Sequence, residues 1–198
     1  MKILLLMREE NSGYANSCYR SAIESFGGEV IECNYHDHYE DLLGILSVVD
    51  GVLLTGGDDA SIMGLFIINY CVRNNKRLLG ICLGMQEMCV YSSDDKIVSI
   101  GDLRHSVEEE KYVHDVLLDA DSKLSKIYGD TRIKVNSHHK QTLERSNYFK
   151  AVGYSDDGLI EAVEGSGDFQ IGVQWHPERM LDFDEGSVRL FKAFLEVE

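Results

Sequence analysis

Cys82 is the strongest candidate for a nucleophile in this chain of 198 residues. It stands in GICLG (80–84), where a glycine lies two positions away on either side, between an apolar run and a helical pattern. This G-x-C-x-G spacing predicts a sharp turn from strand to helix that exposes the side chain, as in a nucleophile elbow. Amides at the start of the helix would lower the pKa of the thiol and stabilise an oxyanion. A buried structural cysteine packed between glycines is the alternative interpretation.

His176 and Glu178 supply the base and the orienting carboxylate that a cysteine nucleophile needs. They flank Pro177, the only proline of the chain, in GVQWHPE (172–178). In an extended strand, residues two apart point to the same side, so the imidazole and the carboxylate can face each other. Because Pro177 cannot donate to a sheet ladder, we expect the strand to end there and to hold the pair rigid. A turn without chemistry is the alternative for this motif alone.

The first 90 residues alternate apolar runs with helical patterns, which predicts βαβ units and a parallel sheet. The expected strands there are 2–7, 29–34, 51–57 and 77–82, and the expected helices are 14–26, 39–47, 61–74 and 84–92. The second half is richer in strands, expected over 96–100, 111–119, 131–137, 149–155, 159–164 and 169–176, with helices near 122–128 and 185–196. We expect one α/β domain over 1–198, with a central, mostly parallel sheet, helices on both faces and a small antiparallel portion. Ligands bind at the carboxyl ends of strands in such sheets, which is where Cys82 lies.

Composition argues against several classes of function. The formal net charge of −15 lacks the basic footprint of a nucleic-acid binder. No apolar run reaches about 18 residues, so we expect no membrane helix. The five cysteines are odd in number and form no C-x-x-C pair, which favours free thiols in the cytoplasm. HDH at 36–38 lacks a second half at metal-site spacing, and no G-x-x-x-x-G-K loop occurs, so we expect no metal and no cofactor.

Taken together, GICLGMQ (80–86) and GVQWHPE (172–178) resemble the class I glutamine amidotransferase superfamily. The segments VLLTGGDD (52–59), VNSHHKQ (135–141) and YSDDGLIEAVE (154–164) extend the likeness over nearly the whole chain, and they are most similar to the γ-glutamyl-γ-aminobutyrate hydrolase branch. The resemblance implies a flavodoxin-like α/β fold. It also implies that Cys82 is the nucleophile, His176 the acid and base, and Glu178 its orienter.

The same resemblance implies further site residues. Gly57 and Leu83 would offer backbone N–H groups to the oxyanion, and Gly56 and Gln86 would contact the glutamyl moiety. His139 would line the pocket near the substrate, with a hydrogen-bonded structural histidine as the alternative. The chain departs from the branch at Leu83, where many of these hydrolases carry arginine. Its glycine loop is also followed almost at once by a helical pattern, so the leaving group cannot be carried over.

Three functions follow from these expectations. The first is hydrolysis of a small γ-glutamyl amide through a cysteine thioester, giving glutamate and a free amine. The second is a glutaminase subunit that acts on glutamine and delivers ammonia to a separate synthase partner. The third is a catalytically silent binding protein on the same fold, which the intact set of Cys82, His176 and Glu178 disfavours. Each function is compatible with a homo-oligomer.

Overall fold

The computed structural model describes residues 1–8, 13–34, 39–94, 96–101, 103–107 and 110–197, so the HDH motif at 36–38 lies outside the described residues. The helices are α1 (Gly13–Glu24), α2 (Tyr39–Val48), α3 (Ile62–Arg73), α4 (Leu83–Val90), α5 (Lys123–Tyr128) and α6 (Glu185–Phe194), with 3-10 turns η1 (Leu103–His105) and η2 (Pro177–Arg179). The strands are β1 (Lys2–Met7), β2 (Glu29–Asn34), β3 (Gly51–Leu54), β4 (Arg77–Ile81), β5 (Val98–Ser99), β6 (Ser106–Val107), β7 (His114–Leu118), β8 (Arg132–Val135), β9 (Ser137–His138), β10 (Gln141–Thr142), β11 (Lys150–Ser155), β12 (Ile160–Glu164) and β13 (Gln170–Val173). Among the described residues, no helix combines the length and the apolar character needed to cross a membrane.

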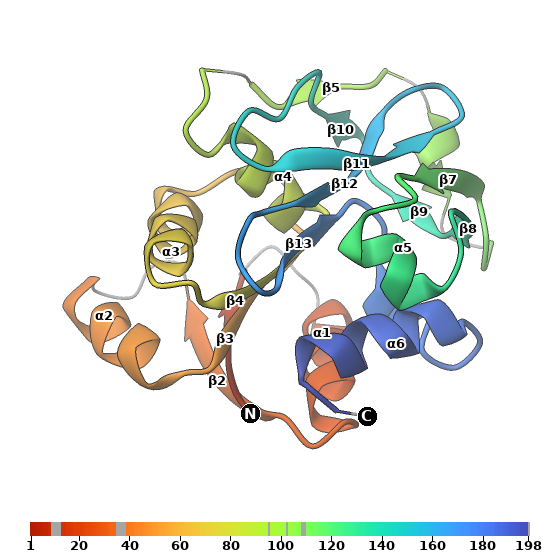
Figure 1. The fold of residues 1–198 in the computed structure, drawn as a ribbon. Helices are drawn as coiled ribbons and strands as arrows, with labels where there is room; N and C mark the ends of the chain where they lie inside the picture. Colours follow the sequence, from red (N-terminus) through yellow and green to blue (C-terminus); the bar gives the residue numbers. More distant parts are fainter. Residues whose placement is uncertain (9–12, 35–38, 95, 102, 108–109, 198) are drawn as a thin grey trace.

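Nine strands form one mixed sheet in the order β2-β1-β3-β4-β13-β12-β11-β7-β8 (Figure 1). The first five strands in this order are parallel. The remaining pairings are antiparallel. The predicted α/β fold with a parallel core is therefore confirmed, and the antiparallel portion continues the same sheet. Two short antiparallel ladders, β5 with β10 and β6 with β9, stand apart from it.

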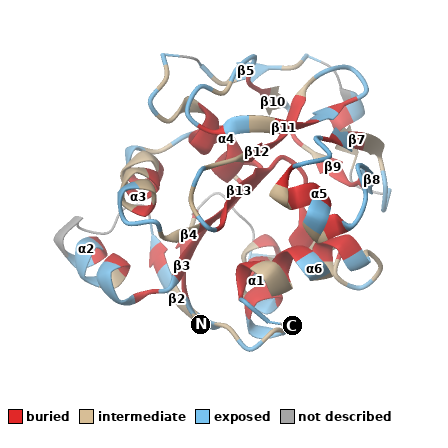
Figure 2. Cartoon of the chain, viewed as in Figure 1, coloured by how far each residue is buried: buried red, intermediate tan, exposed pale blue. Residues whose placement is uncertain are grey.

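Helices cover both faces of the parallel strands. Successive residues of a strand point to opposite sides, so an apolar strand presents apolar side chains on both faces, and both need to be covered. Ile3 and Leu5 of β1 belong to a core with residues of α1, α5 and α6. Leu4 and Leu6 belong to a second core with residues of α2, α3 and α4. All four side chains are fully buried, as a parallel sheet between two helical layers requires. Figure 2 shows buried residues along the central strands and on the helix faces turned toward them.

The predicted boundaries agree best in the parallel half. In the second half, the strand expected over 96–100 is reduced to β5, and the strand expected over 131–137 is divided into β8 and β9. β8 remains in the main sheet, paired with β7, whereas β5 and β9 pair outside it in ladders of two residues each. Apolar alternation predicts that a segment is extended, but the available pairing partner decides how much of it becomes a strand.

Candidate active site

Cys82 occupies the turn between β4 and α4 that the sequence predicted. Its backbone has a positive φ of 54° with ψ −108°, a sparsely populated conformation that costs a non-glycine residue roughly 1–3 kcal/mol. The flanking glycines make the turn possible. A Cβ at Gly84 would lie 2.4 Å from the carbonyl oxygen of Leu54, and a Cβ at Gly80 would lie 2.7 Å from Sδ of Met88. The predicted strand-to-helix turn is confirmed.

The histidine reaches the cysteine because β13 lies beside β4. Gly172 and Val173 are the register partners of Gly80 and Ile81, so the chain leaving β13 emerges next to the turn. The prediction that the strand extends to Pro177 is wrong. β13 ends at Val173, where its neighbour β4 turns into α4, although the Gln174 N–H still donates to the carbonyl oxygen of Glu161 in β12.

The histidine and the glutamate meet through a turn and not through strand alternation. Pro177 is the first residue of η2, a position suited to its fixed φ and missing N–H. The turn brings Nδ1 of His176 to 2.7 Å from Oε1 of Glu178, and both side chains are buried. The expected contact is therefore present, with a different backbone conformation. With Nδ1 bound to the carboxylate, Nε2 is the nitrogen left to face the thiol.

Opposite charges stabilise the thiolate and the imidazolium in this buried site. Burial raises the pKa of the Cys82 thiol, but its hydrogen bond to His176 and the charges of His176 and His139 outweigh burial, so the pKa lies below its ordinary value. Burial lowers the pKa of His176, but Glu178 and Cys82 outweigh it and raise that pKa to about 9. By contrast, burial raises the pKa of Cys71 and Cys89 to about 12. Cys82 is therefore set apart from these two buried thiols.

Two residues that sequence reasoning missed hold the histidine in place. The Asn136 side chain donates to the carbonyl oxygen of His176 at 2.9 Å, and its Oδ1 accepts from the His176 N–H at 2.8 Å. The Tyr19 hydroxyl lies 3.4 Å from Nδ1 of His176 and accepts the Gly56 N–H at 3.0 Å. Asn136 lies in the VNSHHKQ segment and could have been singled out there. Tyr19 carries no comparable signal in its helix.

The thiol opens into a polar cleft of about 420 Å³, a size typical of small-molecule sites. Besides Cys82 and His176, charged side chains line it, namely Asp58, Lys140 and Arg179. The cleft lies at the carboxyl ends of the parallel strands, as expected for this type of sheet.

The residues predicted to contact the oxyanion and the glutamyl group differ in which of their polar atoms are already bound. Gly56 and Gly57 line it, although the N–H of Gly56 is bound to a tyrosine hydroxyl. Leu83 is the first residue of α4, so its N–H is one of the helix amides without an intrahelical acceptor. Gln86 lines the cleft and donates Nε2 to the carbonyl of Gln141 at 3.0 Å, while its buried Oε1 has no partner among the described residues.

A buried ion pair supports the loop that carries these glycines. Nη2 of Arg8 lies 2.7 Å from Oε2 of Glu87 in α4, and both side chains are almost completely buried. Arg8 also donates to the carbonyl of Asp59 at 3.2 Å, and Glu87 accepts the N–H of Ser61 at 2.7 Å. The pair thus ties the end of β1, the glycine loop and the start of α3 to the nucleophile helix.

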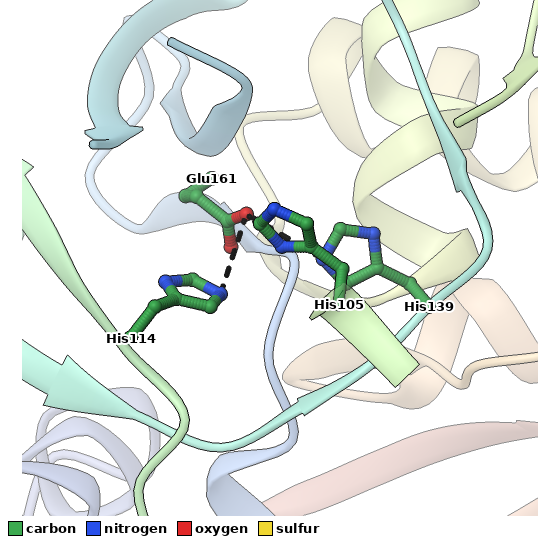
Figure 3. Close-up of side chains that lie close together, drawn as sticks. All are labelled: His105, His114, His139 and Glu161. Atoms are coloured by element: carbon green, nitrogen blue, oxygen red, sulfur yellow. Dashed lines mark ion pairs between the residues drawn. The ribbon is translucent and has the colours of Figure 1, made fainter. Parts of the chain in front are cut away.

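A second cluster of titratable side chains adjoins the cleft. Ligand atoms of His105, His114, His139 and Glu161 lie within 4.8 Å of one another, an arrangement that could hold a metal ion (Figure 3). No sequence motif predicted this set, because its members are spread over more than 50 residues without regular spacing. His139 also lines the cleft, but its Nδ1 lies 3.0 Å from the carbonyl oxygen of Gln141 and its Nε2 faces Glu161.

Comparison with known proteins identifies the family. The model of the Peptidase C26 family matches residues 61–178, more than half of the chain, and this range contains Cys82, His176 and Glu178. The chain therefore belongs to the Peptidase C26 family, within the class I glutamine amidotransferase-like superfamily.

Relatives in sequence agree with this assignment, and a solved structure shares the fold. A predicted glutamine amidotransferase of Schizosaccharomyces pombe is 29% identical over 176 residues, covering 74% of this chain and 69% of its own. One of the subunits of the glutamine-hydrolysing GMP synthase of Haloarcula marismortui is 32% identical over 151 residues, covering 75% and 73%. The fold is similar to that of the glutaminase domain of Trypanosoma brucei CTPS, solved with bound acivicin, with a TM-score of 0.76, 14% identity and coverage of 100% and 94%.

Proposed function

We propose that this protein is a cysteine amidohydrolase that cleaves the amide bond of a γ-glutamyl compound and releases glutamate and an amine. The observation that carries the proposal is the Cys82 thiol on its strained turn, with a lowered pKa, beside the buried His176–Glu178 pair. Cysteine nucleophiles of this kind are activated by an adjacent base that a third group orients.

The first half of the proposed reaction transfers the glutamyl group to the enzyme. The Cys82 thiolate attacks the γ-carbonyl carbon, and a C–S bond forms as the carbonyl oxygen becomes an oxyanion. The N–H groups of Gly57 and Leu83 stabilise this oxyanion, and each such donor typically contributes about 10²- to 10³-fold in rate. His176 then gives its Nε2 proton to the leaving nitrogen. The C–N bond breaks, the amine departs and a thioester remains.

The second half of the reaction returns the enzyme to its starting state. Neutral His176 removes a proton from a water molecule, which attacks the thioester carbonyl. The C–S bond breaks, the thiolate and imidazolium are restored together, and glutamate leaves as its γ-carboxyl group gives the second proton of the water to solvent. Glu178 keeps its charge throughout and stabilises the imidazolium whenever it forms. Electrons and protons therefore balance without an added cofactor.

The charges of the cleft fit a substrate that is an amino acid. A γ-glutamyl group carries an α-ammonium and an α-carboxylate at the end away from the scissile amide. The cleft offers the Asp58 carboxylate to the ammonium and the cationic side chains of Lys140 and Arg179 to the carboxylate. Gln86, whose side chain is held by Gln141 and Gln174, also lines this space.

A glutaminase subunit is the second candidate. The observation that favours it is the 32% identity to one of the subunits of a GMP synthase over 75% of this chain. Its chemistry is the same as far as the thioester, but glutamine is the substrate and the ammonia passes to a separate synthase.

Glutamate release by the purified protein alone distinguishes the candidates. Release that is fast from one γ-glutamyl amide and slow from glutamine supports the stand-alone hydrolase, and release from glutamine that rises on addition of a synthase supports the glutaminase. Cys82→Ala should reduce turnover at least 10³-fold with an unchanged fold. Cys18→Ala, which removes a thiol of α1, is the matched control and should keep full activity. Wild-type turnover by Cys82→Ala would contradict the proposed mechanism, and a Cys82 that iodoacetamide labels no faster than other thiols would favour the silent binding protein.

A further inference from the structure

Three histidines and a glutamate from four separate elements converge on one point. His105 ends η1, His114 begins β7, His139 follows β9, and Glu161 lies in β12. Figure 3 shows the three imidazole rings gathered around the Glu161 carboxylate. We propose that these four residues, the His3Glu cluster, bind one divalent transition-metal ion, with Zn²⁺ as the best fit.

The spacing of the ligand atoms matches a four-coordinate site. Nε2 of His139 lies 3.5 Å from Oε1 of Glu161. Nδ1 of His105 and Nε2 of His114 each lie 3.8 Å from the same oxygen. Ligand atoms of a tetrahedral zinc site with bonds of about 2.0–2.1 Å lie about 3.3 Å apart. The three distances to Glu161 therefore need to shorten by about 0.2–0.5 Å. The atoms of the cluster that are farthest apart, within 4.8 Å of one another, must approach further to enclose the ion.

Each imidazole uses its outer nitrogen in a contact with a neighbouring acceptor. Nδ1 of His139 lies 3.0 Å from the carbonyl oxygen of Gln141, and Nδ1 of His114 lies 3.2 Å from that of Asp115. When these nitrogens carry the proton, the inner Nε2 atoms keep their lone pairs and face the Glu161 carboxylate. Two lone pairs directed at a carboxylate repel it unless a cation lies between them.

His105 shows the same arrangement with a stronger acceptor. Its Nε2 lies 3.0 Å from a carboxylate oxygen of Asp157, and its Nδ1 is directed toward Glu161. This Nδ1 also lies 3.5 Å from the hydroxyl oxygen of Ser137, which donates its own proton to the His105 carbonyl oxygen. A carboxylate that accepts the outer N–H of a metal-binding histidine fixes its tautomer and increases its basicity. All three rings are therefore oriented as metal ligands are.

The Glu161 carboxylate at the centre is faced by the three imidazoles. The Glu161 side chain is completely buried, and neither of its oxygens makes a hydrogen bond in the described part of the chain. The inner nitrogens of His114 and His139 are likewise buried without a hydrogen-bond partner. Burying an unpaired carboxylate costs several kcal/mol, so buried charges are paired or coordinate metals. A divalent cation bound by all four residues would satisfy every one of these atoms.

Nitrogen and carboxylate ligands in this number favour zinc. A set of four protein ligands closes the coordination shell, which is typical of structural zinc sites. A separate pocket of about 360 Å³ is lined by His105, His114 and Asp157, and it gives an ion a path from the surface. The site would join the segment of β9 that lines the catalytic cleft to β7 and β12 of the main sheet. Its role would therefore be to stabilise the cleft wall.

Zinc titration of the metal-stripped protein tests the proposal independently of any substrate. The wild type and Cys82→Ala should each bind one equivalent of Zn²⁺. The variant is included because it lacks the active-site thiolate, so zinc that it binds is not held by Cys82. At a zinc concentration 100 times Kd, the thermal midpoint should rise by about 5–10 °C. Absence of one-to-one binding in Cys82→Ala would overturn the proposal and leave a proton on His139 as the group that neutralises Glu161.

Variants locate the site. Glu161→Gln should abolish stoichiometric binding, and Asp157→Asn, outside the ligand set, should weaken it about 10- to 100-fold. His138→Asn is the matched control, because His138 neighbours His139 but does not belong to the cluster, and it should keep one equivalent at unchanged affinity. Equal affinity in the wild type and Glu161→Gln would place the ion elsewhere and refute the assignment. Should Glu161→Gln fail to fold, the affinity of Asp157→Asn decides the question.

Discussion

Replacing Glu178 by glutamine should lower the pKa of His176 and, with it, the upper pH limit of activity. The side chains are nearly the same size, and the glutamine oxygen can still accept the Nδ1–H of His176. Only the negative charge at 2.7 Å is lost. A cation that loses a neighbouring anion is easier to deprotonate, so the pKa must move down.

The size of the shift follows from the pKa of His176. It stands at about 9 against an ordinary 6.5, although burial opposes the rise. Among the groups that raise it, the charge of Glu178 has the largest effect. We therefore expect a decrease of about two pH units, which is ~2.7 kcal/mol. Two unit charges 2.7 Å apart interact by roughly 6 kcal/mol at an effective dielectric constant of 20, so this shift requires less than half of that energy.

Nuclear magnetic resonance of ring-labelled histidine measures the shift directly. The His176 signal is assigned by its loss in His176→Asn and is followed through a pH titration. Glu185→Gln, at an exposed position at the start of α6, is the matched control and should leave the titration unchanged. Since protonated His176 is the proposed acid for the leaving amine, the basic limb of kcat/KM should move by the same amount.

Two results would refute this reasoning. If His176 titrates within half a pH unit of the wild-type value in Glu178→Gln, the carboxylate is not the source of its high pKa. If the titration moves but the basic limb of kcat/KM stays in place, His176 is not the acid that protonates the leaving group.

Three further substitutions test the scaffold of the site. Asn136→Ala removes both hydrogen bonds to the backbone of the proposed base, so it should destabilise the fold by about 1–3 kcal/mol and lower kcat more than it changes KM, as denaturation and steady-state kinetics would measure. Gly84→Ala places a Cβ 2.4 Å from the carbonyl of Leu54, and it should cost at least about 1–3 kcal/mol of stability in urea denaturation. Arg8→Met leaves Glu87 buried and unpaired, and it should cost about 3–5 kcal/mol. The double variant with Glu87→Met should recover part of that loss, and an Arg8→Met protein of wild-type stability would show that the ion pair is dispensable.

The inner strands of the parallel half could be predicted because they contain uninterrupted apolar runs. Residues 3–6 of β1 and all of β3 are buried on both faces, so hydrophobicity alone identifies them. The G-x-C-x-G turn could be predicted for a related reason, since only glycine fits the close contacts on either side of Cys82. In both cases the physical cause acts within a few residues of chain.

The features that could not be predicted depend on contacts between distant segments. The VNSHHKQ segment could have singled out Asn136 as a site residue, but no local pattern indicates that it binds the backbone of His176. The His3Glu cluster likewise arises from the order of the strands in the sheet. The contact between His176 and Glu178 was predicted from strand alternation, yet a 3-10 turn produces it. Residues two positions apart can meet both in a strand and in a 3-10 turn. The spacing of His176 and Glu178 therefore indicated their side-chain contact but not the backbone conformation that produces it.

The pairing of β4 with β13 also determines when the protein acquires a reactive thiol during folding. Val173 belongs to the last strand of the chain, and its register partner Ile81 precedes Cys82. Contacts between segments so distant in sequence require closure of a long loop and form slowly. Until they form, the unfolded chain carries an ordinary thiol with a pKa of about 8.5, and alkylation and oxidation require the thiolate. Docking of β13 beside β4 therefore brings His176 to the thiol and makes it reactive.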